Sequence, residues 1–131
     1  MADAFQFDLV SPERNVASAQ ATEVRIPGAD GDMTAMAGHA PTLTTLRPGL
    51  VVVSAADGVH EYVVSGGFAE ISASGVTVLA ERAFHRRDIQ KSDFEVLVDH
   101  AKAKVEAAHD DHDHHHKTLA DIEVLGMHLD M

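Results

Sequence analysis

Apolar and polar residues alternate near the start of the chain with the period of a half-buried β-strand. Residues 5–9 read Phe-Gln-Phe-Asp-Leu, so every second side chain is apolar. Residues 24–26 repeat the alternation as Val-Arg-Ile and stop at Pro27-Gly28. Both segments are therefore predicted to be strands with one face against a core.

Two further pairs of apolar runs are separated by short segments that contain glycine. Residues 50–55 and 59–64 flank Asp57-Gly58, which is a strong hairpin signal because glycine tolerates positive φ. Residues 68–71 and 76–79 flank Ser74-Gly75 and predict a second hairpin. Many short strands at this spacing indicate a β-sandwich or a β-barrel.

The apolar period changes to that of a helix from residue 92 onward. Ser92 and Glu95 match the capping box, in which a serine and a glutamate satisfy each other's backbone N–H groups at a helix start. A helix that begins here has one apolar face. That face consists of Phe94, Leu97, Val98, Ala101, Val105 and Ala108.

A second helical period follows the polar residues 110–113, and Thr118 is its expected N-cap. Its apolar stripe consists of Leu119, Ile122, Leu125 and Leu129. The predicted helix has about twelve residues, a length that is marginal for an isolated helix in water. We therefore expect the two helices to pack as an antiparallel hairpin.

The distribution of glycine and proline supports a division near residue 86. All four prolines lie between Pro12 and Pro48, and eight of the nine glycines lie between Gly28 and Gly75. These residues mark turns, so the part after residue 86 avoids turns. The predicted fold class is β plus α, with an N-terminal β-sandwich domain at residues 1–86 and a C-terminal antiparallel two-helix hairpin domain at residues 87–131.

Composition narrows the classes of function. The 131 residues carry a formal net charge of −11, which argues against nucleic acid as a partner because phosphates require a basic surface. The chain has no cysteine, so disulfides, thiolate zinc sites and cysteine nucleophiles are excluded. The first residues do not resemble a secretory signal, and no run approaches the roughly 20 apolar residues that span a bilayer. Direct membrane insertion is therefore not expected.

A cluster of histidine and aspartate between residues 109 and 116 is the most conspicuous local feature. Imidazole and carboxylate groups bind zinc, nickel and copper. The candidate ligands are His109, His112, His114, His115 and His116. Their spacing is poor for one rigid site, and we interpret the cluster as a solvated loop between the helices that binds divalent metals adventitiously. The alternative is a small metal-binding protein that uses this loop.

No other segment has the spacing of a catalytic motif. None of the serines lies in a Gly-x-Ser-x-Gly elbow, and no phosphate-binding Gly-x-x-x-x-Gly-Lys motif occurs. Ser65-Gly66-Gly67 is interpreted as a strand bulge or tight turn, where glycine relieves backbone crowding. The chain is therefore not expected to be an enzyme by itself.

Two separated segments resemble the epsilon-subunit family of bacterial rotary F-type ATP synthases. The first runs from Gly31-Asp32-Met33 to Gly38-His39-Ala40-Pro41 and continues to Arg47-Pro48-Gly49. The second is Ser65-Gly66-Gly67-Phe68, followed by Val76-Thr77-Val78-Leu79-Ala80. The resemblance covers residues 5–86 closely and continues in outline to the C-terminus.

The resemblance implies a non-catalytic central-stalk subunit of the rotor, which couples rotation of the c-subunit ring through the gamma subunit to ATP synthesis. It implies that Gly31, Asp32 and Met33 form a loop that faces the c ring. It also implies that Gly38, His39, Ala40 and Pro41 contact gamma. The family works as a peripheral component at the cytoplasmic face of the bacterial inner membrane.

In this family the hairpin can extend along gamma toward the alpha-beta hexamer and block rotation. Some relatives bind ATP through a motif that contains arginine, but residues 97–102 and 120–123 of this chain have no arginine. We therefore expect no bound ATP or other cofactor. Residues 119–131 contain three acidic residues and no lysine or arginine, so the hairpin is expected to inhibit ATP hydrolysis weakly or not at all.

Overall fold

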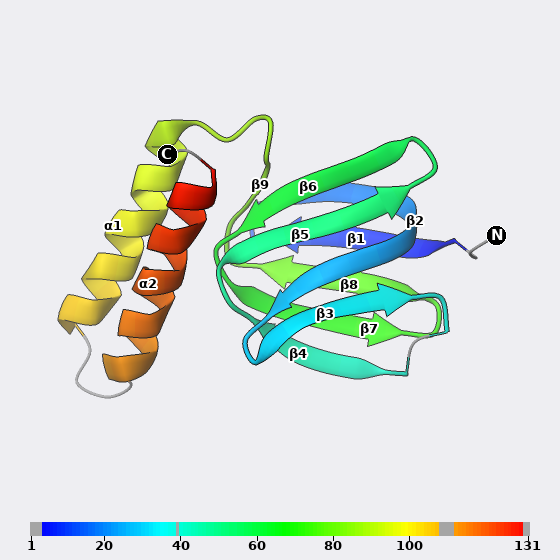
Figure 1. Cartoon of the computed structure of the whole chain (residues 1–131), viewed down its shortest axis with the longest axis horizontal. Coiled ribbons are helices and arrows are strands. Elements are labelled where there is room, and N and C mark those ends of the chain that lie inside the picture. Colours follow the sequence, from blue (N-terminus) through cyan, green and yellow to red (C-terminus); the bar gives the residue numbers. More distant parts are fainter. Residues whose placement is uncertain (1–3, 39, 108–111, 130–131) are drawn as a thin grey trace. The chain divides into compact units, whose positions relative to one another are not determined.

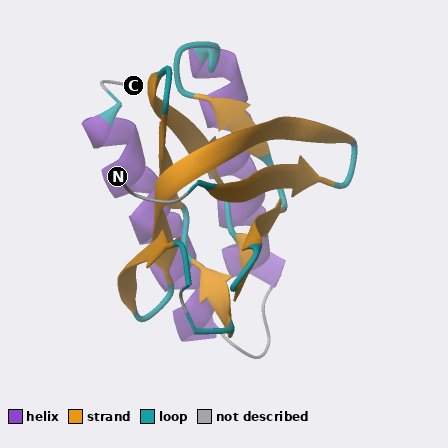
Figure 2. Ribbon diagram, turned by 90° about the vertical axis from the view of Figure 1, so that its right-hand side faces the viewer, coloured by secondary structure: helices purple, strands orange, loops and turns teal. Residues whose placement is uncertain are grey.

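The structure is a computed structural model that describes residues 4–38, 40–107 and 112–129, without the side chains of residues 107, 112 and 113. The chain divides into two compact units, Met1–Arg87 and Asp88–Met131. The described part of the first unit consists of strands and that of the second of helices (Figure 2). The predicted fold class, β followed by α, is confirmed.

Within the described residues, nine strands form one continuous hydrogen-bonded sheet (Figure 1). In chain order they are β1 (Phe5–Ser11), β2 (Arg14–Gly28), β3 (Gly31–Met36), β4 (Thr42–Leu46), β5 (Gly49–Ala55), β6 (Gly58–Val64), β7 (Gly67–Ser72), β8 (Gly75–Ala80) and β9 (Ala83–His85). The two predicted hairpins are present as β5–β6 and β7–β8. The chain also reverses between β1 and β2 and between β2 and β3, which pair antiparallel, and the apolar pattern revealed neither of these hairpins.

The long strand β2 belongs to both layers of the sandwich. Its first part pairs with β1, and its second part pairs with β5 and β3. The register with β5 shifts between Ala21 and Glu23, and such an irregularity bends a strand. The sheet therefore folds over, so that β4, β7, β8 and β1 form one layer and β3, β5, β6 and β9 the other (Figure 1).

The core lies between these layers and follows the alternation in the sequence. On β1 the side chains of Phe5, Phe7 and Leu9 are buried, whereas Gln6 is exposed. The other strands contribute Val24, Ile26, Val51, Val53, Val64, Ile71, Val76 and Val78 to the same cluster. None of the described core positions is polar or charged. The core is therefore held by apolar packing, which stabilises roughly 1.5–3 kcal/mol per large side chain relative to exposure.

The Ser65-Gly66-Gly67 segment is a point of close backbone approach, as predicted. Gly66 and Gly67 both have φ of +133°, a conformation that favours glycine. A Cβ atom on Gly67 would lie 2.0 Å from the carbonyl oxygen of Leu79. Only glycine fits here, because β7 and β8 pair at Gly67 and Ala80.

The second unit contains helices α1 (Lys91–Ala107) and α2 (His112–His128), which lie side by side and run antiparallel (Figure 1). Their buried side chains are Phe94, Leu97 and Ala101 on α1 and Ile122 and Leu125 on α2. These lie on the predicted apolar faces. In the described part of the chain, neither helix is long and apolar enough to cross a membrane.

The predicted start of α1 is wrong by two residues. The backbone N–H of Gln90 donates to Asp93 Oδ2 at 2.9 Å, so Gln90 and Asp93 occupy the capping positions expected for Ser92 and Glu95. Ile89 and Phe94 are both buried, at the positions where a hydrophobic staple forms. This apolar pair favours the earlier start.

The predicted start of α2 is also wrong, because the helix begins at His112. Thr118 lies inside the helix and donates from Oγ1 to the carbonyl oxygen of His114, four residues earlier, at 3.1 Å. Lys117 Nζ forms an ion pair with Asp121 Oδ2 at 2.8 Å. Helix α2 therefore has 17 residues, longer than the sequence indicated.

Candidate functional site

The predicted c-ring segment lies at the start of β3. Gly31, Asp32 and Met33 were expected in a loop, but they are strand residues that pair with Gly28, Pro27 and Ile26 of β2. Asp32 is exposed, whereas Met33 is half-buried and packs against the core. The turn that precedes them is tight because Gly31 has φ of +143°. The carboxylate of Asp32 is thus presented on a strand.

Arg47 fixes this turn from the end of β4. Its Nη1 donates to the carbonyl oxygen of Gly28 at 2.5 Å, and its Nη2 forms an ion pair with Asp32. The backbone N–H of Arg47 donates to the carbonyl oxygen of Pro27 at 3.0 Å. Arg47 therefore holds both the backbone of the turn and the direction of the Asp32 side chain.

The predicted gamma segment forms the connection between β3 and β4. Gly38 has φ of +79°, which is the left-handed conformation of a tight turn. Ala40 and Pro41 are exposed, and Ala40 accepts a hydrogen bond from Thr42 Oγ1 at 3.0 Å. His39 lies outside the described residues. The described part of this segment is thus an exposed turn.

The two predicted contact segments lie at opposite ends of β3. This strand has six residues, so its ends are separated by about 17 Å at the usual rise of a strand. Gly31 begins the strand, and Gly38 follows its last residue, Met36. The first segment is therefore the first half of β3, and the second segment follows the end of the same strand.

The histidine cluster is not a loop in its described part. His114, His115 and His116 lie in the first turns of α2, and the rings of His114 and His115 meet edge to face at 5.5 Å. His109 and the side chain of His112 lie outside the described residues. Among the side chains that the structure does describe, no three His, Asp or Glu groups are placed to hold a metal ion.

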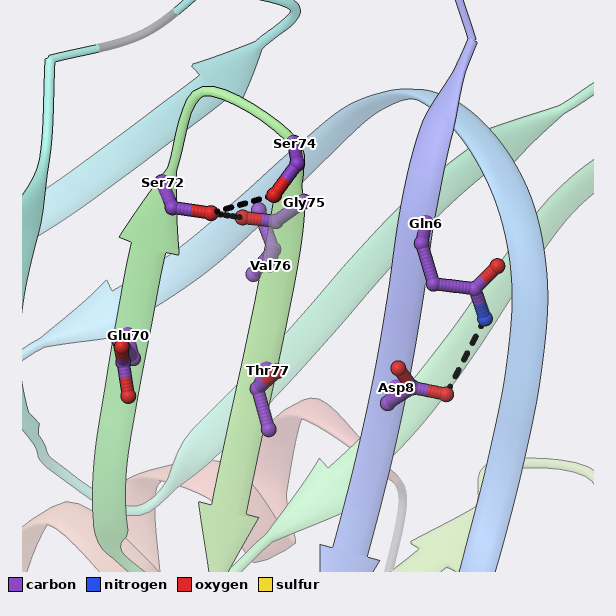
Figure 3. Close-up of a pocket in the computed structure, with 8 residues that line it drawn as sticks. All are labelled: Gln6, Asp8, Glu70, Ser72, Ser74, Gly75, Val76 and Thr77. Carbon is purple, nitrogen blue, oxygen red and sulfur yellow. Dashed lines mark hydrogen bonds between the residues drawn. The ribbon is translucent and has the colours of Figure 1, made fainter.

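A polar cavity of about 240 Å³ lies on the outer surface of the β7-β8-β1 layer (Figure 3). Its lining residues are Gln6, Asp8, Glu70, Ser72, Ser74, Gly75, Val76 and Thr77. Asp8 accepts hydrogen bonds from Ser18 Oγ at 2.6 Å and from Gln6 Nε2 at 3.2 Å. The cavity is not evident in the sequence, since its residues come from separate strands.

Aromatic and imidazole rings gather where β6 meets β9. The Tyr62 ring lies 5.0 Å from His85 and 6.2 Å from Phe7. Burial raises the pKa of the Tyr62 phenol above its usual 10.0. His60 Nε2 donates to Asp57 Oδ1 at 3.0 Å, and this hydrogen bond lowers the pKa of the Asp57 carboxyl. These contacts pack and orient rings, and they supply no nucleophile.

The contacts of Arg47 and the exposure of Phe68 and Leu79 are not evident in the sequence. Arg47 is visible in the sequence only as part of Arg47-Pro48-Gly49, and its partners are 15 and 19 residues away. Phe68 and Leu79 were assigned correctly to strands, but both point outward and are half exposed. Their neighbours Ala69, Val78 and Ala80 provide the buried positions instead.

Comparison with known proteins gives one consistent result. Residues 4–86 match the family described as "ATP synthase, Delta/Epsilon chain, beta-sandwich domain". Along its whole length the chain is 51% identical to the ATP synthase epsilon chains of Ruegeria sp. (strain TM1040) and Rhodobacter capsulatus, and each match covers 100% of both chains. It is also 54% identical to the epsilon chain of Fuscovulum blasticum, over 95% of each chain.

The fold is similar to chains in two solved mitochondrial ATP synthases. A chain of the Euglena gracilis complex, solved with OSCP, F1 and the c ring, superimposes with a TM-score of 0.72 at 22% identity, covering 98% of this chain and 83% of that one. A chain of the Tetrahymena thermophila central stalk and c ring gives 0.68 at 13% identity, covering 95% and 94%. At these identities the comparison concerns the fold alone.

Proposed function

The chain belongs to the ATP synthase epsilon-chain family, and on this premise we propose that it is the non-catalytic central-stalk subunit of a proton-transporting ATP synthase. It couples rotation of the c ring through gamma to ATP synthesis. The match to epsilon chains along the entire length is the observation that carries this proposal. The metal-binding alternative has no support from these relatives, which are named as ATP synthase subunits.

The geometry of β3 supports a bridging role. Gly31, Asp32 and Met33 contact the c ring at one end of the strand, and residues 38–41 contact gamma at the other. Between them the backbone is paired with β2 along its whole length, and Ala35 is buried. A strand held in this way moves with its sandwich as one body. Torque is therefore carried between the two partners without a flexible link.

Arg47 orients the negatively charged carboxylate of Asp32 at the c-ring end of β3. This guanidinium neutralises part of the Asp32 charge, so the exposed carboxylate is oriented before the partner arrives. Replacement of Asp32 by Asn should weaken attachment to the c ring and leave gamma binding unchanged. Replacement of Glu23, a half-buried residue at the far end of the β2–β3 ladder, by Gln is the matched control.

We place the subunit peripherally at the cytoplasmic face of the bacterial inner membrane, without a bound cofactor or ATP. The hairpin reaches the alpha-beta hexamer when it extends along gamma, but it grips weakly because α2 after Thr118 has no lysine or arginine. Deletion of residues 88–131 from the assembled complex should change ATP hydrolysis less than about twofold. A strong rise in hydrolysis would contradict this weak regulatory role.

The metal alternative has its own test. Replacement of His112 and His114–His116 by Ser should leave coupling of proton flow to ATP synthesis intact. A zinc or nickel affinity that these replacements abolish, together with loss of coupling, would favour the alternative function.

A further inference from the structure

The short strand β9 lies at the edge of the sheet, directly before the connection to the helices (Figure 1). Among the described strands it pairs with β6, over Ala83–His85. Arg87 is the last residue of the first unit, and the helical unit follows from Asp88. Short segments with few contacts are the first to open in a folded protein. If β9 opens, the connection between the two units therefore becomes longer.

His85 occupies the last position of β9, on the core side of the sheet. Its ring lies edge to face against Tyr62 at 5.0 Å, and Tyr62 packs against Phe7 in the core. His85 Nε2 is buried, and His85 Nδ1 accepts a hydrogen bond from the backbone N–H of Arg87 at 3.4 Å. A neutral imidazole has one donor and one acceptor nitrogen. The bond to Arg87 therefore assigns the proton of neutral His85 to Nε2.

A second proton on His85 is incompatible with this contact. It would have to bind Nδ1, which would then present an N–H to the N–H of Arg87. The hydrogen bond would be lost, and two donors would face each other. The positive charge would also lie beside the apolar Tyr62 ring with Nε2 shielded from water, where a charge is poorly solvated. Paired β9 therefore takes up a proton less readily than released β9.

His60 is a second imidazole on the same side of β6. The rings of His60 and His85 lie 6.2 Å apart. His60 Nε2 lies 3.0 Å from Asp57 Oδ1, so the carboxylate of Asp57 balances a proton on His60. The acidic group on this side of the sheet is thus matched by His60.

The other charges around β9 largely cancel. They belong to Glu61 on β6 and to Glu81, Arg82, Arg86, Arg87 and Asp88 beside β9 in the chain. Glu61 forms an ion pair with Arg86. Glu81 and Arg82 precede the strand, and Arg87 and Asp88 follow it, so each side has one charge of either sign. The strands β1, β2 and β5 contribute apolar side chains to the adjoining core. The burial of His85 and its bond to Arg87 therefore determine the response to acid.

We propose that protonation of His85 releases β9 from β6, so that residues 83–87 join the connection to the helical unit. At about 3.3 Å per residue, the released segment adds up to roughly 17 Å to this connection. The helical hairpin then reaches farther from the sandwich, while the strands other than β9 stay paired. This response belongs to the chain alone and goes beyond the proposed function.

The direction of the response follows from proton linkage. Released His85 is solvated and takes up a proton near the ordinary imidazole pKa of about 6.5, whereas paired His85 does so less readily. Pairing of β9 is therefore complete above this pH and is lost as the pH falls below it. The ion pair between Arg86 and Glu61 opposes release, but both side chains are partly exposed, at 39% and 33%, and such pairs contribute little.

Amide hydrogen exchange of the full chain, measured by NMR and corrected for the intrinsic effect of pH, tests the release. The reporter is the N–H of Arg86, which donates to the carbonyl oxygen of Glu61 at 2.9 Å. Between about pH 7.5 and about pH 5.5 its protection should fall at least about tenfold, whereas amides of the β7–β8 ladder should change less than about twofold. An equal loss in all strands would indicate global acid unfolding and would overturn the inference.

Two variants assign the response to one imidazole. His85→Gln keeps a hydrogen-bond acceptor but does not titrate, so its Arg86 amide should change less than about twofold over the same range. His100→Gln is the matched control, because His100 is exposed on α1, and it should respond as the wild type does.

The Cε1–H resonance of His85 in the wild type gives a second readout that does not depend on a variant. It should titrate over the pH range in which the Arg86 amide loses protection. The inference is overturned if His85 titrates while Arg86 stays protected, or if folded His85→Gln loses protection in acid as the wild type does.

Discussion

Alanine substitutions at Gly66 and Gly67 test how closely the backbones of β7 and β8 approach each other. Both have φ of +133°, so alanine at either position incurs a similar backbone strain, roughly 1–3 kcal/mol. A Cβ atom on Gly66 would find its nearest neighbours at 3.8 Å, which is an ordinary contact. On Gly67 it would lie 2.0 Å from Leu79 O and 2.9 Å from Ala80 Cα, so β7 and β8 must separate.

The magnitudes follow from this difference. Gly66→Ala should cost about 1–2 kcal/mol, because the lower entropy of the unfolded chain offsets part of the strain. Gly67→Ala should cost more than about 4 kcal/mol, since ladder hydrogen bonds are lost in addition. That is a large part of the roughly 5–15 kcal/mol that stabilises a small domain.

Urea unfolding measures both costs in the same unit. Tyr62 is the only tyrosine, the chain has no tryptophan, and the ring lies in the sandwich core, so tyrosine fluorescence reports on the sandwich. Gly67→Ala should unfold at much lower urea than Gly66→Ala, or be unfolded without urea. Equal midpoints for the two variants would refute the close approach of β7 and β8 at this residue.

Three other predictions concern single contacts. Tyr62 should ionise at a pH above 10.0 in the native protein and at about its usual value in urea, as measured by phenolate absorbance. The raised pKa means that the folded state favours the neutral phenol, so this stabilisation is present below the usual pKa of tyrosine and is lost as the pH rises through the pKa of the folded state. Tyr62→Phe should abolish this loss of stability at alkaline pH. An unchanged loss in the variant would mean that another group causes it. In urea unfolding, Arg47→Ala should lower the free energy of unfolding by about 1–2 kcal/mol. Asp32→Asn should lower it by less than about 0.5 kcal/mol, because Asp32 is exposed. Equal losses would mean that the hydrogen bond from Arg47 to Gly28 contributes nothing to stability. In thermal unfolding, Asp93→Ala should destabilise the hairpin by about 1 kcal/mol and Glu95→Ala by much less. A larger loss of stability in Glu95→Ala would mean that Ser92 and Glu95 cap the helix instead.

The strands were predictable because burial imposes a period of two on the sequence. Residues 5–9, 24–26 and the two hairpins were read correctly from this period and from turn glycines. The strands β3 and β4 were not, because Gly31–Met36 and Thr42–Leu46 contain small or polar residues and present few buried side chains. Their place is set by pairing with β2 and β7, which is a long-range property.

The local sequence pattern alone does not determine where the two helices begin. Gln90–Asp93 and Ser92–Glu95 both offer a carboxylate three residues after a possible cap, and the buried pair Ile89 and Phe94 decides between them. Residues before Leu119 are polar, so the apolar period that identifies α2 is absent from its first turns. Packing of Ile122 and Leu125 stabilises a helix that then extends through the histidines.

The candidate site was predictable in part. The contact segments at residues 31–33 and 38–41 were proposed from a family resemblance, and their positions at the start of β3 and after its end needed the structure. The exposure of Phe68 and Leu79 was hidden because both look like ordinary strand residues until the register places them outward. The same register brings Asp8 and Glu70, 62 positions apart in the sequence, to one cavity.

If this subunit joins gamma to the c ring, gamma and the chain should attach to membranes together. Membranes that contain the c ring are incubated with purified gamma, with and without the full chain, and the bound proteins are quantified after sedimentation. The chain should bind with gamma and increase the amount of gamma retained. A folded chain that stays in the supernatant while both partners are present, with gamma retention unchanged, would contradict this prediction.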